Sequence, residues 1–227
     1  MNKASVLAII PARGGSKGIV DKNLTMFRGK KLIQYTLEAA RESKLVTETI
    51  VSTDSRQISK FCSDFGFDTS YRRPSELASD ESKMTSAISH VLDWLESKHS
   101  KIFDYFIILQ PTSPLRTAGD IDAFINFMIT GNHKTALSVH EMREHPMESI
   151  KVSNSDSWEY LVTPPSDAFG RQEYDGKFLF INGALYGSST VHFKTNGSFL
   201  DPSSARNFFE IPRSRGLEID YQDDLLV

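Results

Sequence analysis

Three glycines and two cations lie close together in the segment Pro11–Gly18, and Lys22 and Asn23 follow it. Glycines let backbone N–H groups come close to an anion, while Arg and Lys side chains supply positive charge to a polyphosphate. The spacing matches neither the P-loop nor the Gly-x-Gly-x-x-Gly fingerprint. We therefore predict a phosphate-binding loop of another type. The alternative is an ordinary strand-to-helix turn whose cations face solvent.

Two carboxylates, Glu218 and Asp220, stand two residues apart at the end of a short strand-like run, which puts them on one face. Paired hard oxygen ligands suit Mg²⁺, which usually takes one or two protein carboxylates plus substrate phosphates. The alternative is a solvated strand edge. We interpret Asp223 and Asp224 as helix N-terminal charges. Asp54 is either a helix N-cap or a site residue, and we favour the N-cap.

The remaining reactive residue types show no catalytic pattern. The six histidines lack metal-ligand spacing, and no Ser/His/Asp constellation can be argued. Cys62, the single cysteine, excludes an internal disulfide and is predicted to be a buried apolar residue of an amphipathic helix. Nine large aromatic residues are predicted to lie mostly in the core and not to form stacking platforms: Trp94, Phe103, Tyr105, Phe106, Phe124, Phe127, Phe178, Phe180 and Tyr186.

Strand and helix patterns alternate up to about residue 140, and these elements must position the polar loops. The predicted strands are Val6–Ile10, Thr49–Thr53, Tyr105–Leu109 and Thr135–His140, and the predicted helices are Leu32–Ser43, Arg56–Phe65, Met84–Leu95 and Asp120–Ile129. Such alternation predicts an α/β fold with a doubly wound, mostly parallel sheet. Ligands of such sheets bind beyond the carboxyl ends of the strands, where the polar loops fall.

The pattern breaks down after the fourth strand. Residues 141–170 have few apolar repeats, and a Ser/Asp/Asn cluster lies at Ser153–Ser157. We interpret this stretch as an excursion from the main sheet. A strand is predicted to return at Phe178–Tyr186, and Glu218–Leu226 closes the chain.

Length and composition limit the class of protein. The 227 residues carry a formal net charge of −3, and no polybasic run is present. This balance argues against a nucleic-acid binder, and the length suits a single domain over residues 1–227. No window approaches the roughly 18 apolar residues of a membrane span. We expect a soluble, cytoplasmic protein that does not bind membranes.

Five segments, in order along the chain, resemble the acylneuraminate cytidylyltransferases, the CMP-sialic acid synthetases and related CMP-nonulosonate synthetases. They are Ile10–Ile19 with Lys22 and Asn23, then Arg73–Asp80, Leu109–Arg116, Arg171-Gln172 followed by Asn182–Tyr186, and Glu218–Asp220. The resemblance implies a Rossmann-like nucleotide-diphospho-sugar transferase fold, CTP as co-substrate, Mg²⁺ dependence and a role in surface polysaccharide biosynthesis. It also implies a homodimer in which the excursion reaches over the partner's site.

The resemblance also implies roles for individual residues. Arg13 and Lys22 would hold the triphosphate, with Gly14, Gly15, Ser16 and Lys17 in the same loop, and Asn23 and Arg73 would contact the cytidine part. Gln110, Arg171 and Tyr186 would line the sugar site, with Asn182 in the same wall. Asp220 would be a metal ligand, with Glu218 beside it.

Three positions depart from the family pattern: Val20 replaces a usual proline, Met84 replaces a hydroxyl residue, and Phe180 stands where bacterial sialic acid enzymes can carry an arginine. An aromatic ring at 180 favours a methyl or N-acyl group over a glycerol tail. We expect preference for a 9-deoxy diamino nonulosonate of the legionaminic or pseudaminic kind.

Other functions stay open at this stage. One is cytidylyl transfer to another 2-keto-3-deoxy sugar acid such as Kdo, although the Gly-Gly-Ser-Lys-Gly run at positions 14–18 is unusual for that group. A second is a catalytically inactive nucleotide-binding homologue. A glycosyltransferase would need an Asp-x-Asp motif, and the chain has none.

Overall fold

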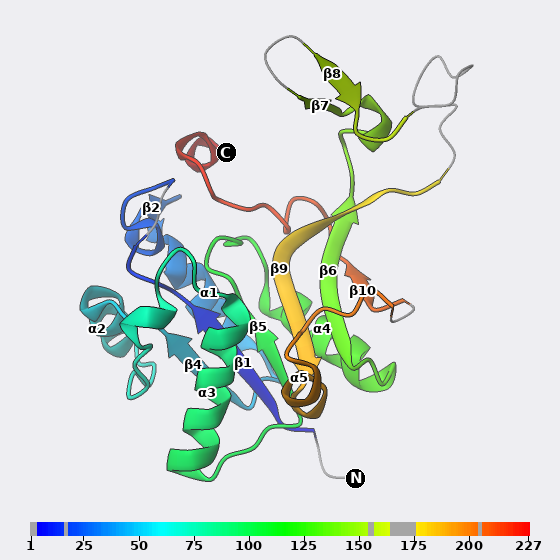
Figure 1. Cartoon of the computed structure of the whole chain (residues 1–227). Coiled ribbons are helices and arrows are strands. Elements are labelled where there is room, and N and C mark those ends of the chain that lie inside the picture. The colour runs from blue at the N-terminus through cyan, green and yellow to red at the C-terminus, as the bar shows by residue number, and fades with distance from the viewer. Residues whose placement is uncertain (1–3, 16–17, 154–156, 164–175, 204–205) are drawn as a thin grey trace.

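A six-stranded sheet forms the centre of the molecule (Figure 1), in a computed structural model that describes all residues except 1–3, 16–17, 154–156, 164–175 and 204–205. Its strand order is β10 (Phe208–Glu210), β6 (Thr135–Glu141), β9 (Leu179–Ser189), β5 (Tyr105–Ile108), β1 (Val6–Pro11) and β4 (Glu48–Ser52). All neighbouring pairs are parallel except those of β9, which runs antiparallel to β5 and β6. The predicted doubly wound, mostly parallel α/β sheet is confirmed.

Helices cover both faces of the sheet (Figure 1). Side chains of α1 (Leu32–Glu42), α2 (Arg56–Asp64) and α4 (Ala118–Thr130) pack in one hydrophobic cluster, and those of α3 (Met84–His99) and α5 (Thr190–Asn196) in another. Each predicted helix is present, with ends within a few residues of the expected ones. Cys62 lies fully buried in the first cluster, as predicted.

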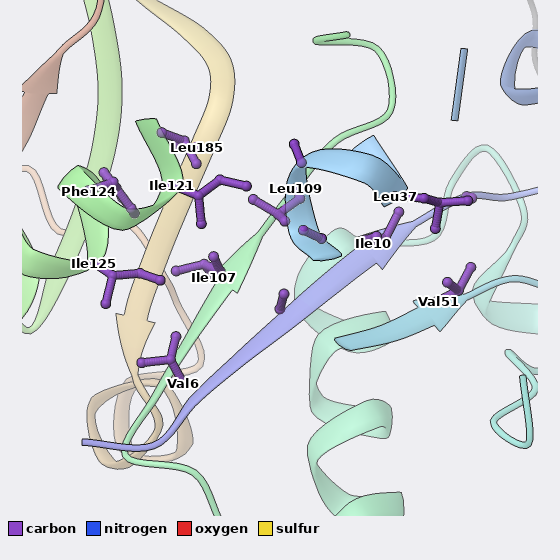
Figure 2. Close-up of a cluster of buried hydrophobic side chains, with 14 of the residues drawn as sticks. Val6, Ile10, Leu37, Val51, Ile107, Leu109, Ile121, Phe124, Ile125 and Leu185 are labelled. Carbon is purple, nitrogen blue, oxygen red and sulfur yellow. The ribbon is translucent and has the colours of Figure 1, made fainter. Parts of the chain in front are cut away.

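The central strands are apolar throughout because both of their faces are covered. In β1, Val6, Ala8 and Ile10 face the first cluster, whereas Leu7 and Ile9 face the second. Figure 2 shows Val6 and Ile10 in line with side chains from β5 and α4. At roughly 1.5–3 kcal/mol for each fully buried aliphatic side chain, this double burial fixes β1 and hence the loop that follows it.

The excursion between β6 and β9 contains a small hairpin of its own. Strands β7 (Ile150–Val152) and β8 (Trp158–Tyr160) pair antiparallel in a separate two-stranded sheet. Figure 1 shows this hairpin standing away from the main sheet, beyond the ends of β6 and β9. The described residues between β6 and β9 thus include a hairpin that is separate from the main sheet, and part of the predicted range 141–170 lies outside the described residues.

The C-terminal segment differs from the prediction. Glu218–Asp220 is irregular rather than strand, although Ile219 is fully buried and its N–H donates to the Thr112 carbonyl (2.7 Å). A short 3-10 helix, η5 (Gln222–Leu226), follows. Asp224 Oδ2 accepts from the N–H groups of Asp220 and Tyr221, which ends the extended run and confirms the N-terminal position of this carboxylate.

Candidate active site

A cavity of about 240 Å³ opens where β1 and β5 end, at the sheet edge where the sequence places the polar loops. Eight of the predicted site residues line it: Arg13, Gly15, Lys22, Asn23, Arg73, Gln110, Glu218 and Asp220. Pro11, Met84, Pro111 and Thr112 complete the wall. Residues from opposite ends of the sequence thus meet in one hollow. Ser16, Lys17 and Arg171 lie outside the described residues.

The glycine-rich loop is tied to its surroundings by two local hydrogen bonds. The Gly14 N–H donates to Asp54 Oδ1 (2.9 Å), and the Asn23 amide donates to the Arg13 carbonyl (3.0 Å). The prediction that Asp54 is an N-cap is wrong, because Ser55 occupies that position of α2 and accepts from the Ile58 N–H. Asp54 is free to anchor the loop because the next hydroxyl caps the helix.

Glycine at position 18 lets this loop approach the C-terminal segment. A Cβ atom on Gly18 would lie 2.4 Å from the backbone oxygen of Asp220, whereas one on Gly15 would have nothing within 4 Å. The loop and the carboxylate-bearing segment are therefore packed backbone to backbone. This contact places the cationic loop beside Glu218 and Asp220.

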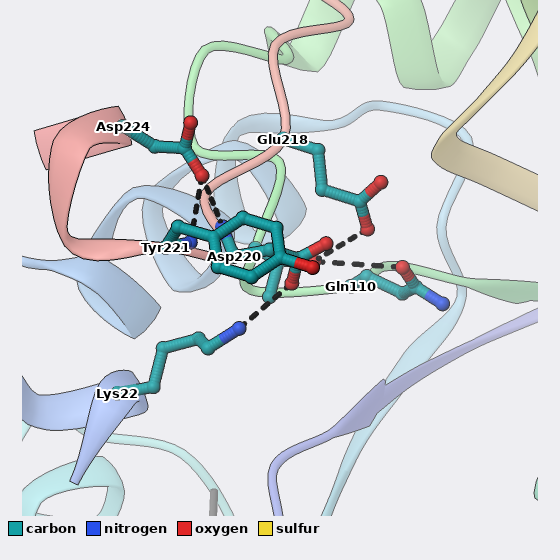
Figure 3. A network of polar contacts seen from close by, with 7 residues as sticks. Lys22, Gln110, Glu218, Asp220, Tyr221 and Asp224 are labelled. Carbon is teal, nitrogen blue, oxygen red and sulfur yellow. Dashed lines mark hydrogen bonds and ion pairs between the residues drawn. The ribbon is translucent and has the colours of Figure 1, made fainter. Parts of the chain in front are cut away.

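The cavity brings cations and carboxylates together (Figure 3). Lys22 Nζ lies 2.7 Å from Asp220 Oδ1, and its side chain is only 12% exposed against 48% for that of Asp220. Arg13 pairs with Asp80 at 2.5 Å and is partly exposed. Arg73 is nearly buried, and burial lowers the pKa of its guanidinium. The site therefore holds three positive groups directed at one hollow.

Glu218 and Asp220 have a donor chemistry that fits a divalent cation. Burial, and next the nearby charge of Asp220, raise the pKa of Glu218, and the Thr112 hydroxyl and the charge of Lys22 offset this only in part. Among the residues that the structure describes, no group of three or more His, Cys, Asp or Glu side chains gathers as a metal site. Two carboxylates that share an ion with substrate phosphates are the arrangement that Mg²⁺ commonly uses.

Thr112 is a site residue that the sequence analysis did not nominate. Its hydroxyl lies 3.5 Å from Gln110 Oε1 and 3.4 Å from Glu218 Oε1, so it joins the two side chains. Its position in the loop that follows the carboxyl end of β5 was the available signal. Arg116, later in the same loop, is buried and donates to the Ala184 carbonyl (2.6 Å), which fixes the loop against β9.

Asn182 and Tyr186 lie outside this cavity. Asn182 Oδ1 accepts from Ser138 Oγ (2.6 Å), while its buried Nδ2 has no partner among the described residues. Tyr186 packs edge-on against Phe199, and burial and the charge of Glu218 raise the pKa of its hydroxyl. Gly14 borders the cavity without lining it. The sugar-site roles of Asn182 and Tyr186 stay predictions.

A second cavity of about 260 Å³ shares Glu218 with the first. Asn182, Phe180, His140 and Arg213 are among its lining residues. The prediction that Phe180 belongs to the core is wrong, because its ring is 50% exposed and packs on His140 with centroids 5.5 Å apart. Strand spacing alone placed it inside, but this end of β9 extends past the helices.

The sequence model of the family described as Cytidylyltransferase matches residues 7–152, which hold the glycine-rich loop, Arg73 and Gln110. The chain belongs to the cytidylyltransferase family. This membership agrees with the resemblance to the acylneuraminate cytidylyltransferases that the sequence indicates. Among the described residues of this cytidylyltransferase, no helix is long and apolar enough to cross a membrane.

Three similar curated proteins carry different names. The N-acylneuraminate cytidylyltransferase of Escherichia coli O18:K1:H7 is 40% identical over 86% of this chain and 42% of its own length. The CMP-N,N'-diacetyllegionaminic acid synthase of Legionella pneumophila is 32% identical over 86% of this chain and 82% of its own. A pseudaminic acid cytidylyltransferase of Campylobacter jejuni is 28% identical over 96% and 92%.

The chain spans about half the length of some relatives, such as the N-acylneuraminate cytidylyltransferase of Streptococcus agalactiae, of which 51% is covered. Among solved structures, a CMP:2-keto-3-deoxy-manno-octonic acid synthetase complexed with CTP superposes with a TM-score of 0.72. It is 19% identical, and the match covers 98% of this chain and 96% of that one. This likeness confirms the nucleotide-sugar transferase type of fold.

Proposed function

We propose that this cytidylyltransferase transfers CMP from CTP to the anomeric hydroxyl of a nonulosonic acid and releases pyrophosphate. The observation that carries the proposal is the cavity at the ends of β1 and β5, where Arg13, Lys22 and Arg73 face Glu218 and Asp220. Cations suit a triphosphate, and paired carboxylates suit the metal ion that accompanies it. The named relatives act on sialic, legionaminic and pseudaminic acids, which supports this acceptor class.

The reaction is a displacement at phosphorus. The acceptor's C2 hydroxyl oxygen forms a bond to the α-phosphorus, the bond from that phosphorus to the bridging oxygen breaks, and pyrophosphate departs as the hydroxyl proton is lost. Such a step depends on positioning and charge neutralisation more than on covalent help from the protein. No side chain in the cavity is assigned as general base.

Each cavity residue takes a role consistent with its chemistry. Arg13 and Lys22 neutralise the charge that develops on pyrophosphate, while the loop of Gly14, Gly15, Ser16 and Lys17, anchored through the Gly14 N–H to Asp54, contacts the phosphates. Asn23 and Arg73 contact the cytidine part. Gln110 lies at the acceptor end, together with Arg171, Asn182 and Tyr186 as the resemblance implies.

Mg²⁺ is part of the proposal because the donors fit it. Asp220 and Glu218 would hold the ion, which would supply positive charge to the phosphate oxygens of CTP. Lys22 pairs with Asp220 in the free protein and so keeps one carboxylate oxygen neutralised until CTP arrives. When Lys22 turns to the phosphates of CTP, Asp220 becomes available to the ion, so the binding of CTP should strengthen the binding of Mg²⁺ and the reverse.

We also propose a homodimer in the cytoplasm, where CTP is available, serving surface polysaccharide synthesis. The β7–β8 hairpin supports the dimer, because most of its large side chains are apolar and exposed: Ile150 53%, Val152 65%, Trp158 58% and Tyr160 45%. A patch of this kind on a projecting hairpin is typical of a protein–protein contact. If light scattering finds only monomer in a preparation that is fully active, the proposed dimer is refuted.

Pyrophosphate release from CTP tests the function. The acceptors are N-acetylneuraminate, a legionaminate, a pseudaminate and Kdo, with a reaction lacking acceptor and one containing UTP as controls. We expect release with CTP and at least one nonulosonate. Release with Kdo and with no nonulosonate would favour the alternative that the enzyme transfers CMP to Kdo. CTP binding without release for any acceptor would favour an inactive homologue.

A further inference from the structure

Asp120 is a buried carboxylate with two separate contacts. It stands in the first turn of α4 and is 6% exposed. Its Oδ2 accepts from the N–H (2.9 Å) and the hydroxyl (2.8 Å) of Thr117, which completes the capping box of this helix. Its Oδ1 lies 3.0 Å from Nε of Arg215, in the C-terminal part of the chain. A capping box needs only one carboxylate oxygen, so the chemistry of the helix end does not explain the second contact.

The contact between Asp120 and Arg215 is one of charges. The Arg215 Nε–H has no hydrogen-bond partner among the described residues, so the two groups attract as an ion pair without a directed hydrogen bond. The side chain of Asp120 is 7% exposed and that of Arg215 is 42% exposed. A carboxylate that is buried to this degree is costly unless a cation stays beside it. Asp120 therefore holds Arg215 against the start of α4.

The segment that carries Arg215 has few other attachments. Residues 211–220 form neither helix nor strand. At the far end of the segment, the Ile219 N–H donates to the Thr112 carbonyl (2.7 Å). Before that point, the ion pair of Arg215 is the shortest polar contact that residues 212–217 make with another described part of the chain. The course of this segment thus depends on two contacts, one at each end.

Glu218 and Asp220 lie beside these two contacts. Glu218 stands between Arg215 and Ile219 in the sequence, and Asp220 follows Ile219 directly. The backbone in between runs close to β9, because a Cβ atom on Gly216 would lie 2.7 Å from a side-chain nitrogen of that strand. A shift of about an ångström is enough to spoil the geometry of a site. Loss of the contact at Arg215 would allow such a shift of Glu218.

We propose that Asp120 and Arg215 are positioning residues, whose ion pair holds Glu218 and Asp220 at the cavity. The inference rests on the proposed function, since it takes these two carboxylates to hold the metal ion that accompanies CTP. Neither Asp120 nor Arg215 lines either cavity, so both act through the segment and not on the substrate. A segment that is held in advance needs less ordering when the ion binds.

Hydrogen exchange of the Ile219 amide tests the ion pair in the ligand-free, full-length protein. Arg215→Met removes the charge and keeps an unbranched side chain, and Asp120→Asn removes the charge at nearly constant shape. Each should speed exchange of this amide by roughly three- to hundredfold, the range for partners in contact. Arg215→Lys keeps the charge and should restore most of the protection, because the pair has no directed hydrogen bond. The double variant Asp120→Asn/Arg215→Met should exchange no faster than the faster single variant.

Thr117→Ala is the matched control, because it removes the hydroxyl of the same capping box and leaves Asp120 beside Arg215. It should lower the Tm without selective exchange at Ile219. The Leu109 amide, which is hydrogen-bonded to β1, reports opening of the whole domain. If Thr117→Ala speeds exchange at Ile219 as much as Arg215→Met does, or if Arg215→Met affects Leu109 equally, the effect is a general loss of stability and the inference is wrong.

Arg215→Met is the decisive variant. Burial lowers the pKa of the Arg116 guanidinium to about 9, and the charge of Asp120 opposes this shift. Asp120→Asn therefore perturbs Arg116 as well as the ion pair. Arg215 is the more exposed partner, so Arg215→Met and Arg215→Lys decide the question even where Asp120→Asn does not fold. Wild-type protection of the Ile219 amide in Arg215→Met would overturn the inference.

The Mg²⁺ requirement separates the inference from the proposed function. Pyrophosphate release from CTP and a nonulosonate is measured against the Mg²⁺ concentration. Arg215→Met should need roughly threefold more Mg²⁺, or a still larger excess, for half-maximal rate, and Arg215→Lys should resemble the wild type. An unchanged Mg²⁺ requirement in Arg215→Met would overturn the positioning role. A wild type that neither binds CTP nor releases pyrophosphate would overturn the proposed function and the metal-ligand roles with it, whereas faster Ile219 exchange in Arg215→Met would still show that the ion pair holds the segment.

Discussion

Replacing Gly18 by alanine tests whether the glycine-rich loop is packed on the Asp220 backbone. The new Cβ would stand 2.4 Å from the Asp220 oxygen, so one of the two backbones must move by about an ångström to reach ordinary contact. Overpacking of this kind costs roughly 1–3 kcal/mol. In a domain of this size, each kcal/mol lowers the Tm by roughly 2–4 °C.

Gly15→Ala is the matched control, because it adds the same methyl in the same loop where nothing lies within 4 Å. Neither glycine has a left-handed φ, so alanine can adopt the backbone conformation at both positions and the two variants differ only in what the new methyl group meets. Both changes restrict the unfolded chain equally, by about 0.4–1 kcal/mol. The difference between the two variants therefore isolates the contact with Asp220.

The assay is calorimetric or fluorescence-detected melting of the ligand-free protein. We expect Gly15→Ala to melt at or slightly above the wild-type temperature and Gly18→Ala to melt roughly 2–12 °C below Gly15→Ala. Equal melting temperatures would show that the loop does not rest on Asp220, and the geometry argued for the site would be refuted.

Three further outcomes are expected. Asp220→Asn replaces the proposed anionic metal ligand at constant volume and should raise the activation barrier by several kcal/mol without lowering the Tm; near-normal rates across Mg²⁺ concentrations would contradict this. Lys22→Ala should raise the KM for CTP far more than that for the sugar, and the opposite split would show that Lys22 does not face phosphate. Burial raises the pKa of the Cys62 thiol to about 12, so alkylation at pH 8 should require unfolding; fast labelling of the native protein would refute this.

The parallel part of the fold was predictable because its signals are local. An uninterrupted apolar run such as Val6–Ile10 has one simple explanation, a strand covered on both faces, and the structure confirms it. The polar loops after such strands must then meet at one edge. That reasoning predicts that the loops carrying Arg13, Lys22 and Gln110 lie together, and all three residues line one cavity.

The errors arose where one local pattern has two long-range explanations. Asp54 after a strand looks the same whether it caps a helix or accepts from Gly14, which is 40 residues away. The alternation at Glu218–Asp220 comes from burial of Ile219 and one hydrogen bond to Thr112, and strand pairing produces the same alternation. The antiparallel direction of β9 depends on the path of the excursion, which composition does not encode.

Phe180 provides the prediction for sugar identity. Its half-exposed ring lines the second cavity, which shares Glu218 with the first. An acceptor whose hydroxyl lies at the α-phosphate in the first cavity can therefore extend past this ring. An aromatic wall packs against methyl and N-acyl groups and offers no partner to the hydroxyls of a glycerol tail. We expect a higher kcat/KM for a 9-deoxy diamino nonulosonate than for N-acetylneuraminate.

Apolar contacts of this kind discriminate by about 1–3 kcal/mol per group, so measurable activity on N-acetylneuraminate should persist. Phe180→Ala should reduce the ratio of the two kcat/KM values at saturating CTP. Ile181→Ala is the control, because Ile181 is the neighbouring residue, is equally exposed at 49%, and is not part of the cavity wall. Equal or higher efficiency with N-acetylneuraminate, or an unchanged ratio in Phe180→Ala, would show that this ring does not select the sugar.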